Sequence, residues 1–519
     1  MKNLNYIQHE HLDYSADQLK LPLDLSIKID KDDPLWMFLE IIEEVNLRKY
    51  LKKHRGNQGH NNLMMMKVVL FAYMNQVYSL RQMEERCRTD IRFMYLSEEE
   101  RPSFMAFQRF INKQIKENIE DIFTEITETI CEKYNANTRI LYIDGTMIEA
   151  NANKFTFVWK KTAEKTLSKI NDRIKKAIKE IEKTTDIKYN QKEIEPRHVG
   201  GYIVKVFNYC QDHEIKFVYG KGKRKTSIQS HYDNLKQYFG KLEECLKKIE
   251  ICGEHRNSYS KTDHDATMMH MKYDYYMNTG VFKAGYNIQL GESDEYIRHV
   301  RVGQDRTDAK TFIPFMNGYY KRYGEYPAIS VGDAGYGTYD NYMYCATREI
   351  DAYLKYQLYE KEKTPEFKKQ LFRSENLLQE KNGKLVCPKG REFRYVFDRE
   401  NRETEYYSVS QIWECENCNR CGFKKQCTKA EGNRRISINV VNNEFKAIAK
   451  ERLDSAVGEQ LRTQRCIQAE GVFGIIKEDW NYVRLHRRGL ENVENEIYLV
   501  CIGFNLMKYH HKKLRKLLS

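Results

Sequence analysis

The chain has 519 residues, a formal net charge of +13 and 31% charged residues. A mean hydropathy of −0.75 and the lack of a long apolar run exclude a typical membrane protein. Hydrophobic residues make up 41% of the chain, enough for a substantial core. The basic balance favours a polyanionic partner such as nucleic acid, although a Lys-rich proteome would produce the same charge.

The first 15 residues lack the apolar stretch of a secretory signal, so we expect a cytoplasmic protein. The 13 cysteines, an odd number in a cytoplasmic chain, argue against a disulfide framework.

The N-terminal quarter of the chain has helical periodicity. Residues 34–54 have the spacing of an amphipathic helix, and residues 64–80 are strongly apolar. Ser103 stands where it can cap a long helix that begins after it. We therefore predict a helical N-terminal domain over residues 1–135.

The next segment is rich in strand-forming residues. We expect a strand at 139–143 that ends at Asp144, a turn at Asp144-Gly145, and further strands near 146–150 and 155–159. After it, apolar residues at intervals of three and four predict an antiparallel helical hairpin over residues 161–260. Its Lys-rich outer face fits a solvated surface at least as well as a nucleic-acid contact.

Strands and helices alternate in the middle of the chain. The pattern predicts strands at 284–290 and 295–304, a helix at 308–324, and a buried strand in 326–337 that reaches a Gly-rich turn at Asp333. A helix and a last strand, 351–356, follow. This order predicts an α/β fold with an RNase H-like mixed sheet.

Three acids stand out by position. Asp144 and Asp333 each follow a hydrophobic strand, and Glu470 lies on a predicted helix, 461–477, with Lys477 two turns further on the same face. Aspartates at the carboxyl edge of a sheet occupy the usual place of a site. Converging carboxylates bind hard divalent cations, and paired Mg²⁺ or Mn²⁺ ions catalyse phosphoryl transfer.

Each acid also has a plainer interpretation. An Asp-Gly pair after a strand is more often a simple turn, and Glu470 with Lys477 resembles a surface charge pair. The conjunction of all three acids is what favours a metal-dependent site.

Cysteines cluster in a segment that interrupts the α/β pattern. Their CxxCxxCx5C spacing, with a CPxG knuckle upstream, is typical of a structural zinc site in a cytoplasmic protein. Four of the five would bind the ion: Cys387, Cys415, Cys418, Cys421 and Cys427. Reduced cysteines without metal are the alternative.

At these residues the chain resembles bacterial insertion-sequence transposases of the DDE class, in the branch with a Tyr-Arg-Glu-Lys signature. The matching segments are YIDGTMIEANANK (142–154), TDHDATMMHMK (262–272), AGYNIQLGES (284–293), SVGDAGYGTYDNY (330–342) and RCIQAEGVFGIIKEDWNYVRLHRRGLENVENE (465–496), together with the helical segment near 60–112. The resemblance implies that Asp144, Asp333 and Glu470 bind the catalytic metals and that Lys477 holds a DNA phosphate.

The chain departs from that signature at one place. The family arginine lies four residues before the glutamate, where this chain has Cys466, and the tyrosine lies seven before it, where this chain has Thr463. Arg465 is one residue out of step, about 100° round an α-helix. We predict DNA contacts for Arg465 together with the basic group His486, Arg487 and Arg488.

Smaller roles are expected for a few further residues. Glu149, Asn151 and Asn153 flank Asp144 in sequence and are candidates to orient metal-bound water or DNA, with ordinary turn residues as the alternative. Asn287 is expected to pair within the core. Trp480 is expected in the core rather than stacked on a base.

The domain expectations combine these elements. Residues 1–135 form the DNA-binding helical domain, 136–160 and 261–360 the first part of the RNase H-like core, and 161–260 the hairpin insertion. Residues 361–440 form the cysteine-rich insertion, and 441–519 complete the core with the Glu470 helix and a basic tail.

The expected function is DNA transposition: metal-dependent hydrolysis at insertion-sequence ends, followed by strand transfer. Two Mg²⁺ or Mn²⁺ ions and a structural Zn²⁺ are the expected cofactors. The expected partners are double-stranded DNA, namely terminal inverted repeats and target DNA, and further copies of the chain on that DNA. The location would be cytoplasmic and nucleoid-associated, with no membrane. Two alternatives are an RNase H-like nuclease without strand transfer and a non-catalytic DNA-binding protein derived from a transposase.

Overall fold

The computed structural model describes residues 28–52, 60–220, 222–271, 280–379 and 384–518. The expected absence of a secretory signal concerns residues outside these ranges. Among the helices within them, none combines the length and apolar character that a membrane span requires.

The N-terminal region is helical, as the sequence predicts. Ser103 caps a helix as predicted, because its side chain accepts a hydrogen bond from the Ala106 amide. The long helix expected after it is interrupted by a π turn at Ile111–Ile115 and a 3₁₀ turn at Lys116–Asn118. The α-helices are α2 (Pro34–Glu44), α3 (Asn62–Met74), α4 (Leu80–Thr89), α5 (Ile91–Leu96), α6 (Phe104–Phe110) and α7 (Ile119–Tyr134).

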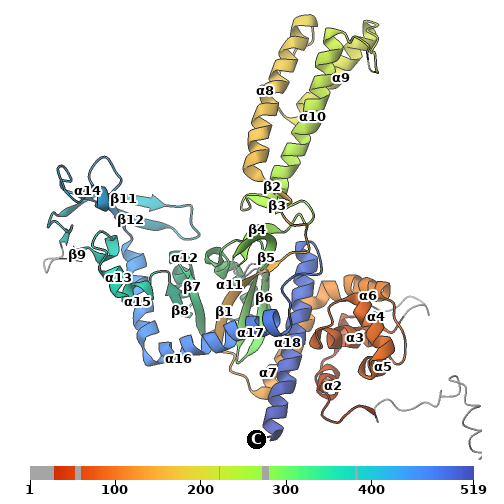
Figure 1. The fold of residues 1–519 in the computed structure, drawn as a ribbon, viewed down its shortest axis with the longest axis vertical. Coiled ribbons are helices and arrows are strands. Elements are labelled where there is room, and N and C mark those ends of the chain that lie inside the picture. The colour runs from red at the N-terminus through yellow and green to blue at the C-terminus, as the bar shows by residue number, and fades with distance from the viewer. Residues whose placement is uncertain (1–27, 53–59, 221, 272–279, 380–383, 519) are drawn as a thin grey trace, which may run out of the picture.

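A mixed sheet forms the centre of the molecule (Figure 1). Its strand order is β6-β5-β1-β7-β8, and β4 pairs with the first part of β5. Strand β1 is antiparallel to β5 and parallel to β7, and β7 is parallel to β8. The strands are β1 (Ile140–Glu149), β4 (Thr267–Met271), β5 (Val281–Ser293), β6 (Tyr296–Gly303), β7 (Ile329–Gly337) and β8 (Asp351–Tyr356).

Helices cover the sheet and join it to the N-terminal region. The helices α11 (Phe312–Tyr323) and α12 (Tyr339–Ala346) connect the strands of the sheet, as predicted. The long helix α18 (Leu490–Leu518) lies between β6 and the helices α3 and α7 (Figure 1). Gly503 permits this packing, since a Cβ there would lie 2.6 Å from the Tyr73 carbonyl carbon on α3.

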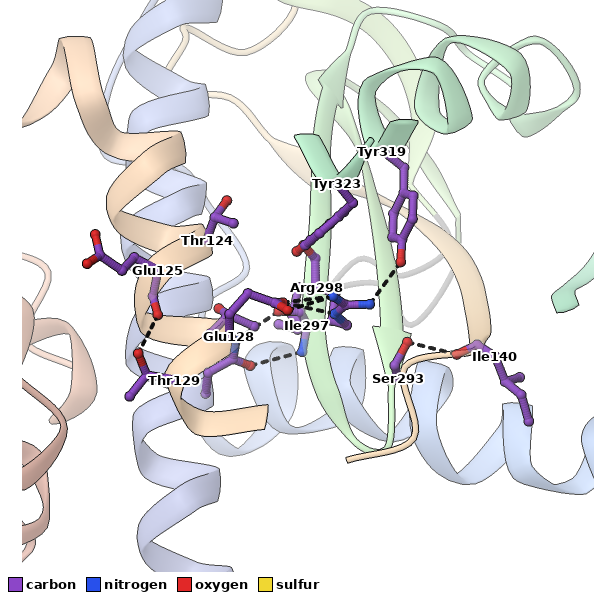
Figure 2. A network of polar contacts seen from close by, with 12 residues as sticks. Thr124, Glu125, Glu128, Thr129, Ile140, Ser293, Ile297, Arg298, Tyr319 and Tyr323 are labelled. Carbon is purple, nitrogen blue, oxygen red and sulfur yellow. Dashed lines mark hydrogen bonds and ion pairs between the residues drawn. The ribbon is translucent and has the colours of Figure 1, made fainter. Parts of the chain in front are cut away.

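A buried arginine links the sheet to helix α7 (Figure 2). Arg298 on β6 donates to both carboxylate oxygens of Glu128 at 2.8 and 2.9 Å. Its other Nη donates to the Tyr319 hydroxyl at 2.9 Å, and Tyr323 lies under the guanidinium at 4.3 Å. Because the arginine is 4% exposed, this pair fixes how the helical region docks.

Three helices project from the sheet as an arm (Figure 1). They are α8 (Lys160–Thr184), α9 (Pro196–Asp212) and α10 (Ser227–Cys252), so one helix more than the expected hairpin. The arm has its own apolar core. The strand expected at 155–159 exists as β2 (Phe157–Trp159), but it pairs with β3 (Ser258–Ser260) at the base of the arm and not with the central sheet.

The cysteine-rich segment folds into small sheets. A three-stranded sheet carries the order β11-β12-β13, and β9 pairs with β10. The elements are α13 (Pro365–Lys368), β9 (Leu378–Gln379), β10 (Leu385–Val386), β11 (Phe393–Asn401), β12 (Ser408–Cys415), α14 (Lys424–Cys427) and β13 (Arg435–Ile438). The chain then returns along α15 (Val440–Asp454) and α16 (Ala456–Arg465) to the central sheet (Figure 1).

Candidate active site

Asp144 and Asp333 stand on neighbouring parallel strands at the same height. The parallel pairing of β1 with β7 ends at Ile143 and Gly332, one residue before each aspartate. The expectation that both aspartates end their strands is wrong, since β1 continues to Glu149 and β7 to Gly337. The turn expected at Asp144-Gly145 is absent because β5 supplies hydrogen-bonding partners to β1 beyond that point.

Gly145 lies where strands β1 and β5 approach the carboxylate of Asp308. A Cβ at this position would overlap the Gln289 amide and lie 2.7 Å from the Asp308 carboxylate. Asn287 and Gln289, both on β5, donate to Asp308 Oδ1 at 2.9 and 2.8 Å. Asn287 therefore pairs within the core, as expected, and its partner is an acid at the site.

Asp308 is an acid that the sequence analysis missed. Its side chain lies beside Asp333, since an added Cβ on Gly335 would lie 3.0 Å from Asp333 Oδ1 and 3.6 Å from Asp308 Oδ2. A weaker signal was available: Asp308 opens the helix predicted at 308–324, a few residues after the strand predicted at 295–304, although it does not directly follow a strand as Asp144 and Asp333 were expected to.

Glu470 reaches Asp144 through Arg465. The stretch predicted as one helix is α16, a π-helix at Cys466–Glu470, α17 (Gly471–Gly474) and a second π-helix at Ile475–Asp479. In a π-helix residue i+5 hydrogen-bonds to residue i, so Glu470 lies over Arg465. Arg465 Nη2 donates to Glu470 Oε1 at 2.6 Å, and Nη1 lies 3.8 Å from Asp144 Oδ2.

The π-helix therefore corrects the apparent one-residue shift of Arg465. The expected 100° offset between Arg465 and the signature position assumed an α-helix. A π-helical turn contains one residue more, so Arg465, five residues before Glu470, lies next to it. Cys466, which occupies the signature position, is exposed.

Arg465 contacts two of the three predicted acids, Asp144 and Glu470. Burial alone would lower the pKa of Arg465, but the carboxylates of Asp144 and Glu470, with a smaller effect from Asp333, raise it above its ordinary value. The arginine side chain is 8% exposed, so these charges act in a poorly solvated place.

A buried tyrosine lies beside the same acids. Burial raises the pKa of the Tyr336 hydroxyl well above its ordinary value, and the charges of Asp308, Asp144 and Asp333 raise it further. The hydroxyl donates to the Gln289 amide oxygen, which joins the tyrosine to the residues that hold Asp308.

The acids have the chemistry of a hard-cation site, and a cation stands among them. Carboxylate oxygens are the ligands that Mg²⁺ and Mn²⁺ prefer. The guanidinium of Arg465 supplies a positive charge between Asp144 and Glu470. Within the described ranges, no three His, Cys, Asp or Glu side chains are close enough together to hold a metal ion.

A basic cleft of about 1080 Å³ adjoins the acids. Lys477 lines it and donates to the Thr146 hydroxyl and, at 3.2 Å, to the Met147 carbonyl. Its basic side chains are Lys154, His270, Lys283, Arg306, Lys477 and Arg484. Among these only Lys477 was predicted, because the others come from separate elements that the fold brings together.

The predicted basic group His486, Arg487 and Arg488 is not part of this lining. Arg488 donates to the Asn151 carbonyl at 2.7 Å, and Asn151 in turn donates to the His486 carbonyl at 2.7 Å. Arg487 donates to the Asn112 side chain at 3.3 Å, and Glu496 accepts its amide. These residues join the segment after the Glu470 helix to its neighbours.

The predictions for Glu149, Asn153 and Trp480 have different outcomes. Glu149 lines the cleft and accepts from Lys283 at 2.8 Å. Asn153 bonds through its backbone: its amide donates to the Thr262 hydroxyl, and its carbonyl accepts from the Thr156 hydroxyl. Trp480 is 8% exposed and packs against Phe504, as a core residue should.

The five cysteines line one small cavity of about 20 Å³, although, in the part of the chain that the structure describes, no three of them are close enough together to hold a metal ion in this arrangement. The Arg434 amide donates to Cys418 Sγ at 3.4 Å, and its guanidinium donates to Cys427 Sγ at 3.1 Å. Burial raises the pKa of Cys415 to about 12, and the neighbouring Cys418 and Cys387 oppose its ionisation too. A soft cation would supply the charge that ionises these thiols.

Two family models match the chain, one near each end. The model described as "Transposase DDE domain" matches residues 386–510, and the model described as "Transposase domain (DUF772)" matches residues 23–113. Searches of curated proteins and of solved structures returned no match.

Proposed function

The two matched domains support an insertion-sequence DDE transposase, and from that premise we propose that this chain cuts and rejoins DNA at insertion-sequence ends by metal-dependent phosphoryl transfer. The observation that carries the proposal is that Arg465 joins Asp144 to Glu470, while Asp333 stands beside Asp144 on the neighbouring parallel strand. Chain segments more than 300 residues apart meet there.

The strand order supports an RNase H-like core. Three antiparallel strands, β6, β5 and β1, are followed by the parallel strands β7 and β8, with the first aspartate on the central strand and the second on its parallel neighbour. The acids lie where the parallel ladder ends, and ligands of open α/β sheets bind at that edge.

In the proposed mechanism Asp144, Asp333 and Glu470 hold the divalent cations, and Arg465 vacates their centre. When bound, two such ions activate the attacking oxygen and stabilise the leaving one. Asp308 sits beside Asp333, where the Asn287 and Gln289 amides orient it. Lys477 and the other basic side chains of the cleft bind phosphates of the DNA end.

Four of the five cysteines hold a structural zinc ion in this proposal. Cys387, Cys415 and Cys418 belong to one buried cluster, and the first and last oppose the ionisation of Cys415, so we place all three in the ligand set. Either Cys421 or Cys427 is the fourth, and the Arg434 contact on Cys427 matches the hydrogen bonds that orient metal thiolates. All-thiolate coordination leaves no open position for catalysis.

The test uses purified full-length protein and duplex DNA that carries the inverted repeats flanking its reading frame, with Mn²⁺ or Mg²⁺. Wild type should nick this DNA and join a pre-cleaved 3′ end to a supercoiled target. Glu470→Gln should lose at least about 100-fold in rate, because a lost metal ligand removes several kcal/mol of charge stabilisation.

The matched control is Glu459→Gln, which removes an exposed carboxylate from the same helical stretch. Equal cleavage by wild type and Glu470→Gln would refute the site. Nicking without joined product would indicate a hydrolytic nuclease, and DNA binding without nicking would indicate a non-catalytic DNA-binding protein.

A further inference from the structure

The projecting arm holds most of the net positive charge of the chain. Residues 160–252 contain 22 Lys and Arg but only 13 Asp and Glu, so this segment contributes +9 of the total +13. The catalytic cleft lies at the sheet, whereas α8 and α10 extend away from it beyond β2 and β3 (Figure 1).

Lysines are concentrated on one face of α8. Six of them recur at helical spacing and all are exposed: Lys161, Lys165, Lys169, Lys176, Lys179 and Lys183. At 100° per residue they fall within about 80° of one another. The opposite face carries the buried residues that pack on α10, among them Ile170, Ile174 and Ile181. Asp172 interrupts the lysine face, and Glu180 at its edge forms an ion pair with Lys183 at 2.6 Å.

A solvated helix surface does not explain this pattern, and the neighbouring helix shows why. On α10, Lys236, Lys241 and Lys247 alternate with acids such as Glu243 and Glu250, which balances the charge as a solvated face usually does. Both helices pack on the same apolar core. The difference between their outer faces therefore reflects something other than solubility.

The lysine face matches the dimensions of a DNA duplex. From Lys161 to Lys183 the helix rises about 33 Å. One turn of B-DNA spans about 34–36 Å and presents a phosphate charge every 1.7 Å or so of axis. A straight row of flexible ammonium groups suits contacts with the phosphate backbone that do not depend on base sequence.

We propose that the lysine face of α8 binds duplex DNA along its phosphate backbone, over about one helical turn, as a second contact outside the catalytic cleft. The inference rests on the proposed function in that the DNA it binds would flank the DNA end held at the acids. The occupant is duplex DNA because the row is long, straight and of one sign.

Binding of full-length protein to a fluorescent duplex of about 40 base pairs, measured by anisotropy in EDTA at several salt concentrations, tests this. The triple variant Lys165→Gln, Lys169→Gln and Lys176→Gln should bind several-fold more weakly at 100 mM salt. Its slope of log K against log salt should be smaller than that of wild type by about 2 to 3, since each lost phosphate contact removes about 0.9.

The matched control is the triple variant Lys236→Gln, Lys241→Gln and Lys247→Gln on α10, which changes net charge equally on the same arm. It should keep a slope within about 1 of wild type. Circular dichroism of both variants checks that the arm stays helical. An unchanged slope in the α8 variant, or equal losses in both variants, overturns the proposal, as does tighter binding of wild type to single-stranded RNA or anionic vesicles.

The outcomes also separate this inference from the proposed function. Binding in EDTA requires no cleavage, so an enzyme that binds DNA through α8 but never nicks it refutes only the proposed function. An enzyme that nicks inverted-repeat DNA while the two lysine variants bind alike refutes only the α8 contact.

Discussion

Replacing Arg465 with methionine should make the metal-free protein less stable and more responsive to divalent cations. Methionine keeps much of the length of the buried side chain but removes its charge. The arginine makes one hydrogen bond of 2.6 Å to Glu470 and lies 3.8 Å from Asp144. Without it, Asp144, Glu470 and Asp333 lose the positive charge that Arg465 supplies.

The expected loss follows from these contacts. A hydrogen bond to a charged group contributes about 1.5–3 kcal/mol. The Glu470 side chain is 55% exposed, which reduces its share, whereas Asp144 is 15% exposed and its repulsion is less screened. We expect a net loss of about 2 kcal/mol, which lowers the melting temperature of a cooperative unit of 150–250 residues by about 4–8 °C.

The assay is thermal unfolding of wild type and Arg465→Met in EDTA and in rising Mn²⁺. A cation at 100 times its Kd stabilises the folded state by about 2.7 kcal/mol. Mn²⁺ should raise the melting temperature of the variant more than that of wild type, because in the variant the ion does not compete with the Arg465 guanidinium for the carboxylates. Arg452→Met is the matched control: it breaks an exposed Arg–carboxylate pair of 2.7 Å with Asp351 and should cost less than about 1 kcal/mol.

Two results would refute this reasoning. One is an Arg465→Met protein as stable as wild type in EDTA, which would mean that the arginine does not compensate the acids. The other is an equal Mn²⁺ response in both proteins, which would mean that the cation binds elsewhere.

Three further changes test the fold around the site. Glu128→Ala should cost about 3–5 kcal/mol in denaturant unfolding, because it leaves the buried Arg298 without its carboxylate. His299→Gln should flatten the pH dependence of stability, because burial lowers the pKa of His299 in the folded protein to about 3. Below about pH 6.5 only the unfolded chain binds a proton at this histidine. The stability of wild type should therefore fall by about 1.4 kcal/mol per pH unit between about pH 6.5 and pH 3 through this group. Gly145→Ala should reduce cleavage at least about 10-fold while Mn²⁺ is saturating, because its Cβ would displace the Gln289 amide that holds Asp308.

Each of these has a contrary outcome, and the first also has a control variant. Glu132→Ala, on the exposed side of the same helix α7, should change stability by less than about 0.5 kcal/mol, and equal losses for both variants would argue against the Arg298 link. Parallel pH profiles of wild type and His299→Gln would show that the histidine titrates normally. Full cleavage by Gly145→Ala would show that the contact between β1 and Asp308 is not needed.

The sequence by itself determined the secondary structure of the core and the acids worth testing. Hydrophobic alternation and length set the strands β5, β6, β7 and β8 and the helices between them, because these depend on local patterns that a single segment carries. The same local reasoning selected Asp144 and Asp333, which do end up on adjacent strands.

Only the tertiary structure decided how those residues meet. The turn expected at Gly145 is a continuous strand because β5, more than 100 residues away in sequence, pairs with it. Arg465 contacts Glu470 because the helix widens into a π turn, and the residue types of this segment do not predict such a turn. Asp308 joined the site through amides on another strand. Such features depend on contacts between distant segments, and the free energy of those contacts overrides local preference.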